Sequence, residues 1–274
     1  MSSGRCGTRW LAHGLRTLYR GVDVEHEPIG PLYRPRRYFR SFDDPEAILE
    51  VPEVARHLER IARSSRPYIE TGWPLFAALP LFAARFGDRL QVVHLTRHPV
   101  PSALSHLARR TYAGSPRSDA YTRWATLGPE DPRVYQASYA SCWDRLTPYE
   151  KCLYWWTEVH LFGLELPGRI GRIPLLRVSA EDLLAGNREV LTTLLEFMAL
   201  PWRDRWLELV GQRVDRWHQL SGDVVDPLEV HRHPTTVDVA QRLGYELAGL
   251  NVGALEARYL GQQHPALDEA GHYV

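Results

Sequence analysis

The chain has 274 residues, of which 44% are hydrophobic, and its 33 lysines and arginines balance 33 aspartates and glutamates. That length and apolar content can bury the core of one domain, expected over residues 1–274. The neutral balance excludes a global field that would attract nucleic acid or a membrane, and no apolar run is long enough to span a bilayer. Because Cys6, Cys142 and Cys152 form no CxxC pair, we expect a reducing, cytoplasmic location.

The predicted elements alternate between short strands and helices. Only Met1 to Ser3 precede the first glycine, so a strand before Gly4 is expected to be missing or very short. In chain order we expect a helix at 8–20, a strand at 22–26, an irregular loop at 28–47, a helix at 51–64, a strand at 67–70, a helix at 74–86, a strand at 89–95, a helix at 99–110, an irregular segment at 113–146, a helix at 148–166, a strand at 173–178 and helices at 187–199, 202–211 and 236–249.

This alternation predicts an α/β fold of three layers, in which helices flank both faces of a central parallel sheet. Ligands of such folds bind at the carboxyl ends of the strands. Five features follow strands, or the place where a strand should be, and are expected to meet at that edge: the loop at 4–8, Glu27, Glu70, Arg97 and Glu181. The long aromatic segment 113–146 is interpreted as a lid or substrate loop.

The loop at residues 4–8 is the first candidate binding element. Its glycines allow close backbone approach, and the helix that follows supplies unpaired N–H groups and a positive dipole end, which favour phosphate or sulfate. It is not the G-x-x-x-x-G-K-[ST] loop of Mg-ATP enzymes, because no lysine follows Gly7. Since Lys151 is the only lysine of the chain, cationic anion contacts must come mainly from arginine. A plain glycine-containing helix cap is the alternative interpretation.

The second candidate element is Thr96-Arg97-His98-Pro99 together with Ser105. Arg97 ends a predicted strand, and Ser105 lies two turns into the next helix, so both side chains can converge on one phosphate. Taken alone, these residues are better explained as a surface ion pair and a helix-filling serine. Two anion-binding elements in one chain indicate a ligand with phosphates at both ends.

Together these segments resemble the sulfotransferase superfamily, in a style closest to its bacterial and carbohydrate-type members. Residues 4–11 are similar to the family's 5′-phosphosulfate loop, and the spacing of eight from Arg97 to Ser105 matches its 3′-phosphate motif. The glycine-rich basic segment near the C-terminus of soluble members is not evident. Further similar segments follow in the family's order, at residues 25–29, 68–71, 177–183 and 194–201.

The resemblance implies a P-loop-like fold and the donor 3′-phosphoadenosine-5′-phosphosulfate (PAPS), whose sulfuryl group moves to a hydroxyl or amine of a carbohydrate, lipid or small-molecule acceptor. No metal is required, because a sulfuryl group carries less charge than a phosphoryl group. Arg5, Thr8 and the loop N–H groups stabilise the leaving phosphate. The resemblance assigns donor binding to Gly4, Arg5, Cys6, Gly7, Thr8, Arg9, Trp10, Arg97 and Ser105.

The catalytic candidates are Arg5 and three residues that could remove the acceptor's proton: Glu27, Glu70 and His26. Glu27 ranks first because it follows a strand and precedes Pro28, which favours extended backbone. Glu70 ranks second, with a structural role as its alternative. His26 ranks third, because strand alternation would point it to the face opposite Glu27.

Two alternative functions stay open at this point. An ATP-dependent small-molecule kinase predicts magnesium dependence, and a non-catalytic nucleotide-binding module predicts donor binding without turnover. No metal site is expected, since His231-Arg232-His233 has no matching cysteine or aspartate cluster. The sequence indicates neither the acceptor nor the oligomeric state.

Overall fold

Two pairs of parallel strands form the centre of the molecule. In the computed structural model, β1 (Asp23–His26) pairs with β2 (Tyr68–Thr71), and β3 (Val92–Thr96) pairs with β4 (Leu175–Ser179). The carboxyl ends coincide within each pair, because the last residue of one strand lies opposite the last residue of the other. The expected α/β architecture with parallel strands is therefore confirmed. The structure describes residues 1–29, 49, 51–113, 126–212 and 224–260.

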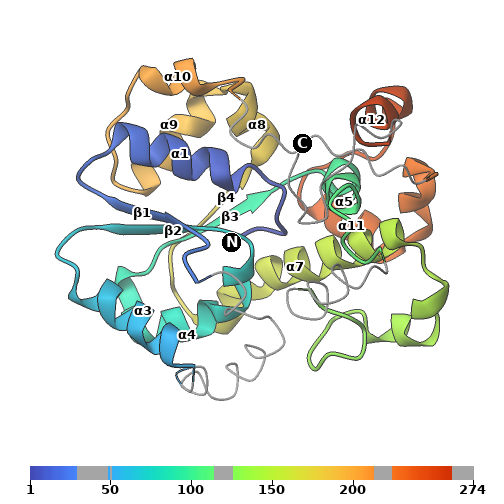
Figure 1. The fold of residues 1–274 in the computed structure, drawn as a ribbon, viewed down its shortest axis with the longest axis horizontal. Helices are drawn as coiled ribbons and strands as arrows, with labels where there is room; N and C mark the ends of the chain where they lie inside the picture. Colours follow the sequence, from blue (N-terminus) through green and yellow to red (C-terminus); the bar gives the residue numbers. More distant parts are fainter. Residues whose placement is uncertain (30–48, 50, 114–125, 213–223, 261–274) are drawn as a thin grey trace, which may run out of the picture.

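Residues Met1 to Ser3 lie along β3 (Figure 1). The Met1 amino group donates to the Val93 carbonyl at 2.6 Å, and the Leu95 N–H donates to the Met1 carbonyl at 2.9 Å. These alternating bonds have the pattern of a parallel ladder. The segment that leads into the loop at 4–8 is thereby fixed against β3.

Helices lie on both sides of the strands (Figure 1). On one side are α1 (Thr8–Leu18), α8 (Ala180–Ala185), α9 (Arg188–Phe197) and α10 (Arg205–Leu209). On the other side are α3 (Pro52–Arg63), η4 (Pro74–Ala78), α4 (Leu79–Phe86) and η5 (Gly87–Arg89). Beyond the strand ends lie α5 (Pro99–Leu107), η6 (Ala137–Ser141), η7 (Trp143–Arg145), η8 (Pro227–Arg232), α11 (Pro234–Arg242) and α12 (Val252–Tyr259). The long helix α7 (Pro148–Ile170) extends from this region back against β3.

The alternation of side chains along β3 explains this layering. Val92 packs into a core cluster with residues of α3, α4 and α7, whereas Leu95 packs into a second cluster with residues of α1, α9 and α10. Successive side chains of a strand point to opposite faces, so a strand that is apolar on both must be covered on both. A third cluster joins α5, α7, η8 and α11, and these helices extend the molecule beyond the strand ends.

The long aromatic helix α7 is longer than expected, running to Ile170 rather than 166, and Thr147 with Glu150 forms a capping box at its start. The expected helix at 236–249 instead ends at Arg242, because Gly244 takes a left-handed backbone with φ +84°. Residues 30–47 of the expected loop and 114–125 of the expected lid lie outside the described residues.

The rest of the expected lid, residues 126–146, packs on α7. The carboxylate of Glu158 accepts hydrogen bonds from the N–H groups of Tyr135 and Gln136, at 3.0 and 2.8 Å. Burial raises the pKa of this carboxyl group, and the two N–H donors oppose that rise. This buried acceptor fixes the described part of the segment against the helix.

Candidate functional site

The loop at residues 4–8 has the backbone geometry of an anion cradle. Gly4, Arg5 and Gly7 are all left-handed, with φ of +85°, +57° and +77°, and α1 begins directly after them at Thr8. No side chain caps the first turn of α1, so the helix presents its N-terminal N–H groups toward the loop. At Gly4 a Cβ atom would lie 3.1 Å from the ring of His106, so the close packing there favours glycine.

The two elements that the sequence predicts to bind anions meet in space. Arg5 Nε donates to Ser105 Oγ at 2.9 Å, and Arg97 Nη1 donates to the carbonyl of Arg5 at 2.5 Å. Arg97 Nη2 donates to the hydroxyl of Tyr259 at 2.8 Å, and the indole of Trp156 donates to the carbonyl of Arg97. Residues that are 92 and 100 positions apart in the sequence are therefore joined at the carboxyl end of β3.

Ser3, which precedes the loop, is held by side chains of α5 and α7. Its carbonyl accepts from His106 Nε2 at 2.9 Å and from the indole of Trp155 at 2.8 Å. Burial, and secondarily the positive charge of Arg5, lowers the pKa of His106 to about 3, so the ring is neutral and donates through Nε2. The loop therefore begins from a fixed residue.

A buried hydrogen-bond chain ends at the same loop. Cys6 Sγ donates to the Gly4 carbonyl at 2.9 Å, and burial raises the pKa of the Cys6 thiol to about 11, which keeps its proton in place. Ser3 Oγ must then donate to Cys6 Sγ at 3.7 Å and accept from His160 Nε2 at 3.2 Å. His160 Nδ1 in turn accepts from His94 Nε2 at 2.8 Å, which leaves the buried Nδ1 of His94 without a partner. One thiol proton thus fixes the tautomers of both histidines.

The remaining residues of the loop motif divide between the interior and the sheet edge. The side chains of Cys6 and Trp10 are buried, and Trp10 Nε1 donates to the carbonyl of Leu209, so these two residues can meet a ligand only through their backbones. Arg9 lies toward β1, where its charge acts on His26. The side chain of Arg5 is the loop group that points to the Ser105 position.

Glu27 follows β1 in a left-handed conformation, with φ +48°. The expectation that Pro28 holds it extended is wrong, because the chain turns at Glu27 to leave the sheet while its N–H still donates to the Thr71 carbonyl at 3.0 Å. Gly72 accommodates this turn, since a Cβ atom there would lie 2.6 Å from Glu27 Cγ. The Glu27 side chain is 27% exposed, so solvent reaches it.

His26 lies beside Glu27 rather than on the opposite face. The turn at Glu27 ends the strand alternation and brings His26 Nε2 to 3.8 Å from Glu27 Oε1, while His26 Nδ1 bonds to Thr71 Oγ1 at 3.0 Å. Burial lowers the pKa of His26, the Glu27 carboxylate opposes that shift and the Arg9 guanidinium adds to it. A carboxylate, an imidazole and a guanidinium therefore gather at the carboxyl end of β1.

Glu70 is enclosed in a polar network against α3. Its carboxylate, 5% exposed, accepts from His57 Nε2 and from the Tyr68 hydroxyl, both at 3.0 Å. The hydroxyl of Tyr68 also lies 2.7 Å from Glu25, which pairs with Arg60. Such a buried hydrogen-bond network is typical of residues that hold a helix against a strand.

Glu181 is also engaged in structural contacts near the site. Its Oε1 accepts from the N–H of His98 at 2.9 Å, and its Oε2 accepts from the Tyr245 hydroxyl at 3.2 Å. The sequence motifs do not single out Tyr245, Tyr259 or Trp156, which lie far along the chain from Arg97.

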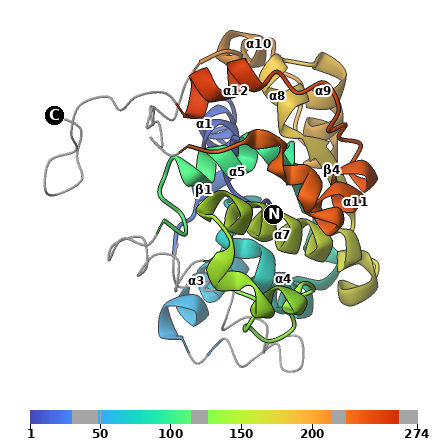
Figure 2. The ribbon, with the colours of Figure 1, turned by 90° about the vertical axis from the view of Figure 1, so that its right-hand side faces the viewer.

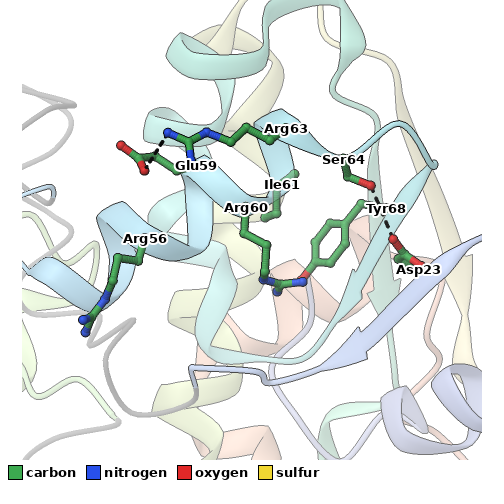
Figure 3. Close-up of a pocket in the computed structure, with 8 residues that line it drawn as sticks. All are labelled: Asp23, Arg56, Glu59, Arg60, Ile61, Arg63, Ser64 and Tyr68. Carbon is green, nitrogen blue, oxygen red and sulfur yellow. Dashed lines mark hydrogen bonds and ion pairs between the residues drawn. The ribbon is translucent and has the colours of Figure 1, made fainter.

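A surface cavity of about 440 Å³ lies elsewhere, at the amino ends of β1 and β2 (Figure 3). Asp23 and Tyr68, the first residues of these strands, line it together with residues of α3. It is therefore distinct from the candidate site at the carboxyl ends. Among the described residues, no helix is long and apolar enough to cross a membrane, and no three His, Cys, Asp or Glu side chains gather as a metal site.

No family model and no curated protein matches the chain. Solved structures that are similar to it include two sulfotransferase domains, each at 16% sequence identity and over 90% of this chain. One is the sulfotransferase domain from the curacin biosynthetic pathway, of which 96% is covered with a TM-score of 0.49. The other is the sulfotransferase domain from the Synechococcus PCC 7002 olefin synthase, of which 93% is covered with a TM-score of 0.48.

Proposed function

We propose that the chain is a sulfotransferase that moves the sulfuryl group of PAPS to a hydroxyl or amine acceptor. The observation that carries this proposal is the direct contact between the two anion-binding elements, through Arg97 to the Arg5 carbonyl and through Arg5 to Ser105. PAPS carries anionic groups on both its 5′ and 3′ sides, and two neighbouring cationic elements fit such a ligand. The three cysteines are free thiols, which supports the expectation of a reducing, cytoplasmic environment.

Each part of the site has a role in this reaction. The loop N–H groups, Arg5 and Thr8 hold the 5′ side and stabilise the charge of the leaving phosphate. Glu27 accepts the proton of the acceptor hydroxyl while the acceptor oxygen bonds to sulfur and the bond from sulfur to the phosphate oxygen breaks. The products are the sulfated acceptor, a protonated Glu27 and adenosine 3′,5′-bisphosphate.

Nucleotide binding tests the assignment of the 3′ side. We expect adenosine 3′,5′-bisphosphate to bind more tightly than adenosine 5′-phosphate, and Arg97→Ala to remove that preference. Losing a charged phosphate contact costs roughly 1.5–3 kcal/mol, which is about ten- to a hundred-fold in affinity. Isothermal calorimetry measures both constants, with Arg85→Ala on α4 as the control for an exposed arginine far from the site. Equal affinities for the two nucleotides in the wild type overturn the assignment.

Turnover separates the proposed reaction from its alternatives. Labelled PAPS is incubated with a panel of sugar, phenol, lipid and amine acceptors, with and without an excess of chelator. We expect labelled acceptor to form at the same rate in both conditions, because sulfuryl transfer needs no metal to offset charge. Magnesium-dependent phosphorylation from ATP would favour a kinase, and nucleotide binding with no transfer to any acceptor would favour a non-catalytic module.

A further inference from the structure

The direction of the hydrogen bond between Arg97 and Tyr259 indicates what kind of ligand this site can bind. A guanidinium has only donors, so the Tyr259 oxygen must accept the 2.8 Å hydrogen bond from Arg97. By the same argument the Ser105 oxygen accepts the 2.9 Å bond from Arg5. Among the described residues neither hydroxyl has a second hydrogen-bond partner, so each keeps a proton to donate. Two guanidiniums and two hydroxyls are therefore linked into one hydrogen-bonded group through Arg5 and Arg97.

The hydroxyl of Tyr259 is held in position by the packing of its ring. Tyr259 is 7% exposed and belongs to the same apolar cluster as Val100, Leu104 and Leu107 on α5. It is the last residue of α12, which lies against α5 on the side away from α7 (Figure 2). Because the ring is anchored in the core, its oxygen stays next to Arg97 without the entropy cost of fixing a mobile side chain.

We propose that Tyr259 is a ligand of the phosphate group that Arg97 and Ser105 bind, so that α12 completes the recognition site for the 3′-phosphate of the nucleotide. This inference rests on the proposed function and adds a residue from the far end of the described chain. A set of donors alone suits a ligand group with several lone pairs and no need to donate, such as a phosphate dianion. A 3′-hydroxyl would leave several of these donors unpaired, so the site discriminates against nucleotides that lack the phosphate.

The test is Tyr259→Phe, which keeps the buried ring and removes only the hydroxyl. We expect its affinity for adenosine 3′,5′-bisphosphate to fall about ten- to a hundred-fold, since a hydrogen bond to a charged group is worth roughly 1.5–3 kcal/mol. Its affinity for adenosine 5′-phosphate should not change. The matched control is Tyr149→Phe, because Tyr149 belongs to the same apolar cluster but donates to the Pro227 carbonyl instead. That control should leave both affinities unchanged.

The possible outcomes separate this inference from the proposed function. A loss of bisphosphate binding in Tyr259→Phe, without a loss in Tyr149→Phe, supports the inference. An unchanged bisphosphate affinity in Tyr259→Phe, while Arg97→Ala still weakens it, overturns the role of Tyr259 and leaves the proposed function standing. Tighter binding in Tyr259→Phe also overturns it, because the hydroxyl would then compete with the phosphate for Arg97. If neither nucleotide binds the wild type, both proposals fail.

Discussion

The two strand pairs differ in how their polar residues are arranged. Beside β3 and β4, the cationic side chains of Arg5 and Arg97 bond to hydroxyls and a carbonyl, groups that a ligand phosphate can join or replace. Beside β1 and β2 lie the carboxylates of Glu27 and Glu70, and Glu70 is already enclosed by His57 and Tyr68. The proposed function assigns anion binding to the first region and proton acceptance to the second.

In each of the two regions, only some of the polar side chains are accessible to a ligand. In the β1–β2 region, burial and hydrogen bonding set Glu70 apart from Glu27, which is only half-buried at the strand end beside His26. In the β3–β4 region, the buried histidines act beneath the loop rather than at its surface. A candidate site is therefore better defined by which polar groups stay accessible than by which polar groups are present.

The largest expected effect follows from changing the accessible carboxylate. We predict that Glu27→Gln lowers turnover by about 10²–10⁴-fold, the usual contribution of a general base, while nucleotide binding is retained. Initial rates with saturating donor measure turnover, and calorimetry measures binding of adenosine 3′,5′-bisphosphate.

Glu70→Gln is the matched control, since it changes a carboxylate of the same region that is buried. Its turnover should stay near that of the wild type once the folded fraction is accounted for. The assignment reverses if Glu70→Gln abolishes turnover and Glu27→Gln does not. If both variants are fully active, neither carboxylate is the base, and His26 becomes the leading candidate.

Acid should destabilise the protein through the histidines beneath the loop. Burial lowers the pKa of His106 and of His160 to about 3, and it also lowers the pKa of His94. These rings have an ordinary pKa near 6.5 when unfolded, so between about pH 6.5 and 3 the unfolded chain binds more protons than the folded one. The free energy of unfolding should therefore fall as pH drops through this range, by about 1.4 kcal/mol per pH unit for each histidine.

Urea unfolding at pH values from 7 to 4 measures this dependence. The variant His160→Gln keeps a hydrogen-bond donor and an acceptor but cannot titrate. Its unfolding free energy should therefore depend less steeply on pH, by the equivalent of about one proton taken up on unfolding. A slope that is the same in the variant and the wild type would show that His160 does not contribute.

A smaller loss of unfolding free energy is expected from adding a side chain next to these buried histidines. A Cβ atom at Gly163 on α7 would lie 2.4–2.8 Å from three ring atoms of His94, and that ring is fixed by its bond to His160. We predict that Gly163→Ala costs roughly 1–3 kcal/mol of unfolding free energy. Gly168→Ala on the same helix meets nothing within 4 Å and should be neutral or slightly stabilising. Equal unfolding free energies for the two variants would contradict the prediction.

Sequence patterns predicted those parts of the candidate site whose geometry depends on residues close together in the sequence. Glycines before a helix indicated the loop, and the spacing from Arg97 to Ser105 indicated a second element, and the structure brings the two segments into contact. The strand expected at 89–95 lies at Val92–Thr96, because its apolar run is buried on both faces.

Features set by distant contacts could not be predicted in this way. Tyr259 reaches Arg97 across 162 positions, and no spacing rule connects two residues that meet only through the packing of α12 on α5. The left-handed turn at Glu27 was missed because Pro28 favours extended backbone locally, whereas the bond to Thr71 and the space at Gly72 decide the geometry. Tertiary contact overrides the local preference there.

The helix that follows the loop is synthesised early, but it packs against residues that are synthesised much later. Trp10, two positions after the loop, donates to the Leu209 carbonyl 199 positions later, and Gly14 packs against Trp206. At about 5–20 residues per second, a ribosome needs about 10–40 s to add the residues between Trp10 and Leu209. The nascent chain therefore carries α1 without its contacts to Trp206 and Leu209 through most of translation, and these contacts form only after the chain has passed residue 209.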